Sequence, residues 1–201
     1  MLRARFFRYE YRSTRPDTAR TFYANVVGPE IWSRGAVVTT LPEQALSKGA
    51  RPHWLGHIGP ADVASVVARM TQLGPTRPEG DAVVLDPFGA RFAVARSGEV
   101  PEPSCVAWAL HHSEDRDQAF ALYSELFGWS EEEMLDRFTN LARLPEVHPQ
   151  WLYFFRVPDL DAAMERTRAL GGLVLQPVRA PSGNRVVPCN DAEGGAFGLF
   201  S

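Results

Sequence analysis

The chain carries an internal sequence repeat. Residues 8–28 read RYEYRSTRPDTARTFYANVVG, and residues 108–128 read WALHHSEDRDQAFALYSELFG. Five residues agree at positions whose numbers differ by 100, namely Ser13/Ser113, Asp17/Asp117, Ala19/Ala119, Tyr23/Tyr123 and Gly28/Gly128. An internal repeat constrains the architecture of a chain more than any single motif does. We therefore predict two related halves, residues 1–98 and residues 104–201, joined by the Pro-, Gly- and Ser-containing segment from Ser97 to Ser104.

Two further pairs of similar segments follow in the same order in each half. Pro52-His-Trp-Leu corresponds to Pro149-Gln-Trp-Leu, and the turn DPFGARF that starts at Asp86 corresponds to DAEGGAF at Asp191. The repeat therefore extends over nearly the whole chain.

The periodicity of apolar residues predicts alternating strands and helices. Residues 5–13 alternate with period two, which is typical of a strand, and a helix is expected to begin at Pro16 with Thr14 as a candidate cap. The same order recurs in each unit; strands are expected at 36–41, 53–58, 83–85, 91–94, 106–112, 151–157, 173–178, 185–188 and 196–200, and helices at 61–73, 115–127 and 160–170. Between Ile31 and Ala50 we expect short strands. The organisation predicted is α+β, with four tandem βαβββ-like units.

The composition is that of an ordinary globular protein. Apolar residues make up 45% of the chain, charged residues 22%, and the net charge is −3. This balance favours neither a nucleic acid nor a membrane as partner. The N-terminus has no apolar core of a secretory signal, and we expect a cytoplasmic protein with Cys105 and Cys189 as reduced, buried thiols.

The repeated segments resemble the vicinal oxygen chelate superfamily, which contains glyoxalase I, bleomycin-resistance proteins and extradiol dioxygenases. The resemblance rests on FYANVVG and LYSELFG and on the turns DPFGARF and DAEGGAF. The segment from Pro149 to Gly172 is similar to two-domain glyoxalase-like proteins of the mycobacterial 27 kDa antigen type. The resemblance implies that the units pair into two curved mixed sheets, with helices on the convex faces and a ligand cup on each concave face.

The resemblance also implies where a metal would bind. Metal-bearing members supply His or Gln from a first strand and Glu from the closing strand. The closing-strand positions here hold Ala93 and Gly198, and the first-strand positions hold Arg8, Leu55, Trp108 and Leu152. None of these side chains provides the expected N or O donor. We predict no metal site of this type and no cofactor.

Strand alternation predicts which residues line the two cups. In the first cup, Glu10 and His57 would form a carboxylate–imidazole pair able to act as a general base, with Arg8 binding an anionic oxygen. We favour the alternative, a buried ion-pair network. In the second cup, the rings of Trp108 and Phe154 would stack a flat molecule that His112 or Arg156 orients. Ordinary core packing explains these residues equally well.

Three functions fit these patterns. The first is a glyoxalase- or bleomycin-resistance-like protein that binds a small aromatic or hydrophobic molecule without a metal. The second is an atypical, metal-independent lyase, isomerase or dioxygenase that uses Glu10, His57 or His112 as its base. The third is a non-catalytic interaction protein with vestigial cups. A homodimer is compatible with all three.

Overall fold

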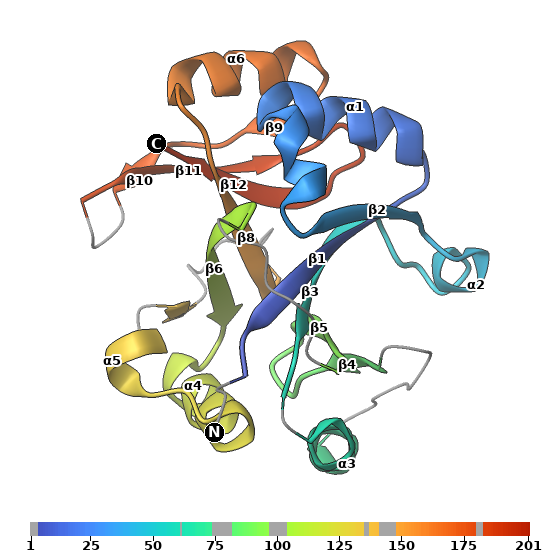
Figure 1. Ribbon diagram of the computed structural model, residues 1–201, viewed down its shortest axis with the longest axis vertical. Coiled ribbons are helices and arrows are strands. Elements are labelled where there is room, and N and C mark those ends of the chain that lie inside the picture. Colours follow the sequence, from blue (N-terminus) through green and yellow to red (C-terminus); the bar gives the residue numbers. More distant parts are fainter. Residues whose placement is uncertain are drawn as a thin grey trace. The chain divides into compact units, whose positions relative to one another are not determined.

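The computed structural model describes residues 4–60, 62–73, 82–96, 104–134, 137–140, 148–179 and 183–201. Most of the predicted linker, residues 97–103, lies outside the described residues. In the first half the elements are β1 (Phe6–Ser13), α1 (Pro16–Val26), η1 (Pro29–Ser33), β2 (Ala36–Thr40), α2 (Glu43–Leu46), β3 (His53–Ile58), α3 (Val63–Leu73), β4 (Ala82–Leu85) and β5 (Arg91–Val94) (Figure 1).

The second half repeats this order with longer strands at its end. Its elements are β6 (Val106–Ser113), α4 (Arg116–Phe127), α5 (Glu131–Met134), β7 (Phe138–Asn140), β8 (Gln150–Arg156), α6 (Leu160–Ala169), β9 (Leu173–Val174), β10 (Val178–Arg179), β11 (Arg185–Asn190) and β12 (Ala196–Phe200). The predicted strand–helix alternation is confirmed in both halves.

Local sequence explains where the helices begin and end. In α1, Pro16 occupies the first turn, where its missing N–H costs nothing, and the buried stripe consists of Ala19, Phe22, Tyr23 and Val26. In α4, Asp115 accepts a hydrogen bond from the backbone N–H of Gln118, and Gly128 ends the helix with φ of 70°. The repeated Gly at this position thus allows the left-handed conformation at the end of α4.

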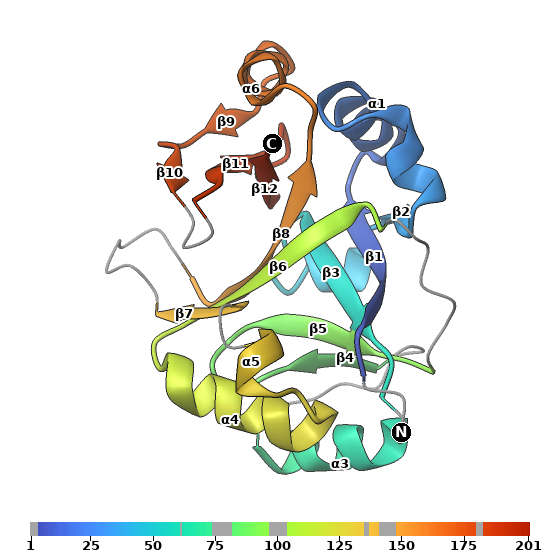
Figure 2. The ribbon, with the colours of Figure 1, turned by 60° about the vertical axis from the view of Figure 1, so that its left-hand side comes forward.

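The strands form two mixed sheets, one from each half. The first has the order β2-β1-β3-β5-β4, and the second has the order β10-β11-β12-β8-β6-β7, with β9 also paired to β11. The pair β4–β5 is antiparallel, whereas β1–β2, β3–β5 and β8–β12 are parallel (Figure 2). The predicted α+β class with two mixed sheets is confirmed.

Contacts divide the chain into two compact units that each draw on both halves. Unit 1 comprises Met1–Arg8, Leu55–Val100 and Ala109–Leu152, and unit 2 comprises Tyr9–Trp54, Pro101–Trp108 and Tyr153–Ser201. In unit 2, α1 from the first half lies beside α6 from the second (Figures 1 and 2). The halves 1–98 and 104–201 each supply one sheet, and as domain boundaries they stay a prediction.

Three local expectations were wrong. The N-cap residue of α1 is Arg15, and its side chain forms no capping hydrogen bond. Thr14 therefore does not cap this helix. Between Ile31 and Ala50 only β2 is a strand, because η1 and α2 occupy the rest. The strand expected over 173–178 is divided into β9 and β10, which is consistent with Pro177, since proline has no N–H to donate to a ladder.

No helix in the described part of the chain combines the length and the apolar character that crossing a membrane requires.

Candidate functional site

The residues that the halves share build a buried polar centre in unit 2. Asp191, in the turn between β11 and β12, accepts a hydrogen bond of 2.6 Å from the hydroxyl of Tyr23 on α1. The indole Nε1 of Trp54 donates to the same hydroxyl at 2.8 Å. The other Asp191 oxygen accepts the backbone N–H groups of Glu193 and Gly195 at 2.8 and 3.0 Å. Burial raises the pKa of Asp191, and these hydrogen bonds oppose that rise.

Unit 1 contains the corresponding centre. The Tyr123 hydroxyl donates to Asp86 at 3.0 Å, and Trp151 Nε1 donates to Tyr123 at 2.9 Å. Asp86 also lies 2.8 Å from His111 Nε2, and both side chains are 0% exposed. Trp54 and Trp151 are both buried. The repeated Tyr, Trp and Asp residues therefore satisfy one another inside the fold.

The two centres differ at one member. His111 in unit 1 corresponds to Tyr11 in unit 2, where burial and the neighbouring Asp191 carboxylate raise the pKa of the Tyr11 hydroxyl. Both side chains are fully buried. Neither centre offers a solvent-accessible catalytic group.

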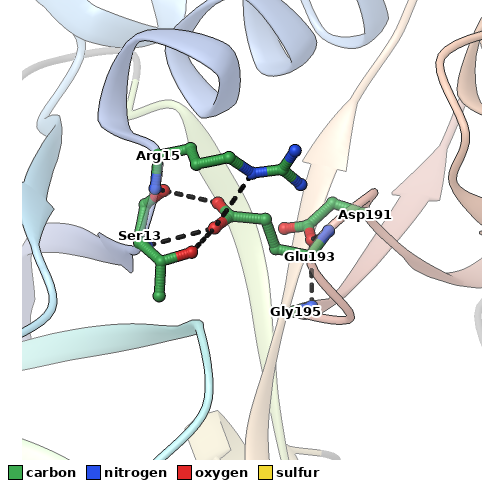
Figure 3. Close-up of polar contacts among 6 residues, drawn as sticks. Ser13, Arg15, Asp191, Glu193 and Gly195 are labelled. Carbon is green, nitrogen blue, oxygen red and sulfur yellow. Dashed lines mark hydrogen bonds and ion pairs between the residues drawn. The ribbon is translucent and has the colours of Figure 1, made fainter. Parts of the chain in front are cut away.

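Glu193 forms a polar cluster that sequence reasoning missed (Figure 3). Its carboxylate accepts hydrogen bonds from the hydroxyl of Ser13 and from the backbone N–H and the hydroxyl of Thr14, the last two at 3.0 and 2.5 Å. Arg15 Nε lies 3.9 Å from the same carboxylate, whose side chain is only 6% exposed. The carboxylate thus ties the turn after β11 to the junction between β1 and α1.

The first half lacks this arrangement. Phe88 stands at the position corresponding to Glu193, with its ring 6.2 Å from that of His111. Ser113, the counterpart of Ser13, has a buried hydroxyl without a hydrogen-bond partner among the described residues. Because Glu193 has no acidic counterpart, comparison of the halves could not single it out.

The predicted second-cup residues Trp108 and Phe154 contact each other in unit 2. Their ring centroids lie 4.6 Å apart at 31°, and Phe154 is 2% exposed. Phe154 on β8 pairs with Gly198 on β12. A Cβ atom at Gly198 would lie 2.2 Å from the Phe154 ring. The aromatic ring therefore occupies the space into which a side chain at position 198 would project.

Arg156 lies two residues beyond Phe154 on β8. It pairs with Phe200, and its guanidinium carbon lies 5.1 Å from the centroid of the Phe200 ring. Because side chains two residues apart on a strand share a face, Phe154 and Arg156 project from the same side of the sheet. We call Trp108, Phe154 and Phe200 the aromatic wall. The indole Nε1 of Trp108 is buried and has no acceptor within the described ranges.

Glu10 forms an ion pair with a neighbour on its own strand, Arg12. It is 7% exposed and accepts hydrogen bonds from Arg12 Nε at 3.0 Å and from Thr39 Oγ1 at 2.6 Å. Glu10 belongs to unit 2, whereas His57 and Arg8 belong to unit 1. The pairing of Glu10 with His57, and the role of Arg8, stay predictions.

The two histidines among the candidate residues are both in unit 1. His57 is 1% exposed, with its ring centroid 6.3 Å from that of Phe7. Burial, and to a smaller extent the neighbouring His111, lower the pKa of His112 to about 4. His112 is therefore neutral at physiological pH and a weak base.

Two open hollows lie against helices rather than against the predicted cup residues. The larger, of about 630 Å³, is lined in unit 1 by residues of α4 together with Trp129 and Glu131. The smaller, of about 350 Å³, is lined in unit 2 by residues of α1 together with Leu170 and Ala192. The polar residues that line the larger hollow are Arg116, Asp117, Ser124 and Glu131, and those that line the smaller are Asp17, Thr18 and Thr21. Among the described residues no three His, Cys, Asp or Glu side chains are grouped to hold a metal ion.

The sequence is similar to those of several known proteins, but no family model matches the chain. CFP32 of Mycobacterium bovis and of Mycobacterium tuberculosis, named as a candidate glyoxylase, is 25% identical over 197 residues, covering 82% of this chain and 75% of the relative. The anthracycline biosynthesis protein DauV of a Streptomyces strain is 30% identical over 127 residues, covering 52% of this chain and 46% of DauV.

Solved structures share the fold at low identity. The 2,3-dioxygenase LapB from Pseudomonas sp. KL28 matches with a TM-score of 0.61 and 11% identity, over 98% of this chain and 91% of LapB. Homoprotocatechuate 2,3-dioxygenase from Brevibacterium fuscum matches with a TM-score of 0.61 and 15% identity, over 100% and 80% of the two chains. The shared architecture is that of extradiol dioxygenases.

Proposed function

We propose that the chain is a glyoxalase-like protein of the vicinal oxygen chelate superfamily that binds a small aromatic or hydrophobic molecule in a concave cup of its second half, without a metal ion. The observation that carries the proposal is the contact between the tilted rings of Trp108 and Phe154 next to Gly198. Aromatic side chains supply large apolar contact areas for planar ligands.

The buried indole Nε1 of Trp108 has no acceptor among the described residues, a property that it shares with Trp32 Nε1. A buried N–H without an acceptor is costly, and such groups in native proteins call for an explanation. An oxygen atom of a bound ligand would supply the missing acceptor. The name of DauV connects that relative with anthracyclines, which contain fused aromatic rings.

The side chains at the superfamily's metal position do not fit a metal ion in the second half. Gly198 stands where the closing-strand carboxylate would be, and the Phe154 ring fills the space that a carboxylate would need. Trp108 offers no lone pair for coordination. In the first half the corresponding residue, Ala93, is fully buried and likewise has no donor atom.

Catalysis by the predicted bases is less well supported. The Glu10 carboxylate already accepts hydrogen bonds from Arg12 and Thr39. With its pKa lowered to about 4, His112 lies well below the range in which a general base works best near neutral pH. The non-catalytic interaction protein stays the remaining alternative. A cytoplasmic location and a homodimer stay predictions.

The proposal is tested by ligand binding to the purified protein. A panel of small aromatic compounds is screened by thermal shift, and hits are measured by calorimetry on wild type, Trp108→Ala and Trp32→Ala, which removes a comparable indole on η1. We expect binding to wild type and Trp32→Ala and at least tenfold weaker binding to Trp108→Ala. Equal binding to all three proteins, or stoichiometric Zn, Ni, Mn or Fe in the purified protein, would contradict the proposal.

A further inference from the structure

We infer that the molecule held at the aromatic wall is a planar aromatic acid, whose ring lies against Trp108 and whose acidic group binds Arg156. This inference rests on the proposed function and specifies the chemical class of the ligand. It follows from the placement of one exposed cation beside buried aromatic side chains.

Arg156 is the charged side chain that β8 and β12 place beside the wall. It projects from the same face as Phe154, and its exposed guanidinium lies over Phe200. Phe154 and Phe200 are 2% and 7% exposed, so the surroundings of the guanidinium on this side are apolar. A charge in such surroundings interacts more strongly with a counter-ion than a fully hydrated charge does.

Arg156 forms no ion pair with any carboxylate in the described part of the chain. The contrast with its neighbours in unit 2 is informative, because Arg12 binds Glu10 and Arg185 binds Asp161. The guanidinium carbon lies over the Phe200 ring, and a guanidinium in such a contact still has N–H groups able to donate. Those donors match a carboxylate, which accepts two parallel hydrogen bonds.

The spacing of the strand sets the size of such a ligand. Residues two apart on a strand are separated by roughly 6.5–7 Å, which is about the length of one substituted aromatic ring. A ring stacked beside the pair Trp108–Phe154 can thus direct an attached carboxylate to Arg156. A neutral aromatic molecule of the same shape would leave the guanidinium without its counter-ion.

The test uses 2-naphthoate and its neutral counterpart 2-naphthamide, measured by calorimetry on the full-length protein. Wild type is expected to bind naphthoate at least tenfold more tightly than naphthamide, with a preference that declines as salt is added. Arg156→Gln should bind both compounds with the affinity that wild type has for naphthamide, and Arg156→Lys should keep part of the preference. Arg166→Gln, which removes an exposed arginine on α6, is the matched control and should behave as wild type.

The outcomes separate this inference from the proposed function. Equal binding of the two compounds to wild type, or an unchanged preference in Arg156→Gln, would contradict the inference that the ligand is an acid. The proposal that the ligand is aromatic would still stand. Absence of binding for both compounds, together with no hit in the wider aromatic panel, overturns the proposed function and the inference with it.

Discussion

At the scale of single residues, comparison of the two halves distinguishes the residues that they share from those that differ. Tyr23 and Tyr123 are shared, and each satisfies a buried aspartate and an indole N–H. Positions that differ between the halves, such as Arg8 and Trp108, are the ones at which strand alternation predicts the lining of the cups. Identity across the internal repeat here marks residues that hold the fold.

His112 is expected to make the folded state sensitive to acid. Burial lowers its pKa from 6.5 to about 4 in the folded protein, so the unfolded chain takes up the proton first as the pH falls. The free energy of unfolding should therefore decline between pH 6.5 and pH 4, by up to about 3 kcal/mol from this group. Urea unfolding of His112→Leu across this range should show a shallower decline than wild type.

His148→Leu serves as the control for the loss of a histidine, because His148 is exposed on the surface. Parallel profiles for wild type and His112→Leu would show that His112 titrates alike in the folded and unfolded chains.

At the scale of elements, the Glu193 carboxylate stabilises the junction between β1 and α1. It accepts hydrogen bonds from Ser13 and Thr14 while nearly excluded from water. Glu193→Gln removes the charge but keeps the size, and its amide group can no longer accept all of these bonds. We expect the free energy of unfolding to fall by about 1–3 kcal/mol.

Urea unfolding measures the effect, and Glu165→Gln on the exposed side of α6 gives the comparison for loss of a surface charge. If both variants lose the same small amount, the cluster in Figure 3 contributes nothing beyond surface electrostatics.

The order of elements was predictable from the sequence, and the contacts between elements were not. Period-two alternation identified β1, and the apolar stripe identified α1, because these signals arise within each segment. Glu193 lies in a turn 180 positions from Ser13, so no local pattern connects them. Likewise, alternation placed Trp108 and Phe154 on one face, but it could not reveal that their rings contact each other.

At the scale of the whole molecule, the two halves depend on each other for burial. In unit 2, α1 of the first half packs beside α6 of the second, and Tyr23 binds Asp191. In unit 1, Tyr123 of the second half binds Asp86 of the first. A half expressed alone would expose apolar helix faces and leave these tyrosines and aspartates unsatisfied.

We therefore predict that the fragments 1–100 and 101–201 do not fold independently. Each alone should lack a cooperative urea transition and the near-ultraviolet circular dichroism of packed aromatic rings, and mixing the two should restore both signals. Tyr23→Phe in the first fragment should weaken this reassembly, because Asp191 then loses its hydrogen bond from α1, whereas Thr21→Ala on the exposed side of the same helix should not. A cooperative transition in either isolated fragment would show instead that residues 1–98 or 104–201 form an autonomous domain.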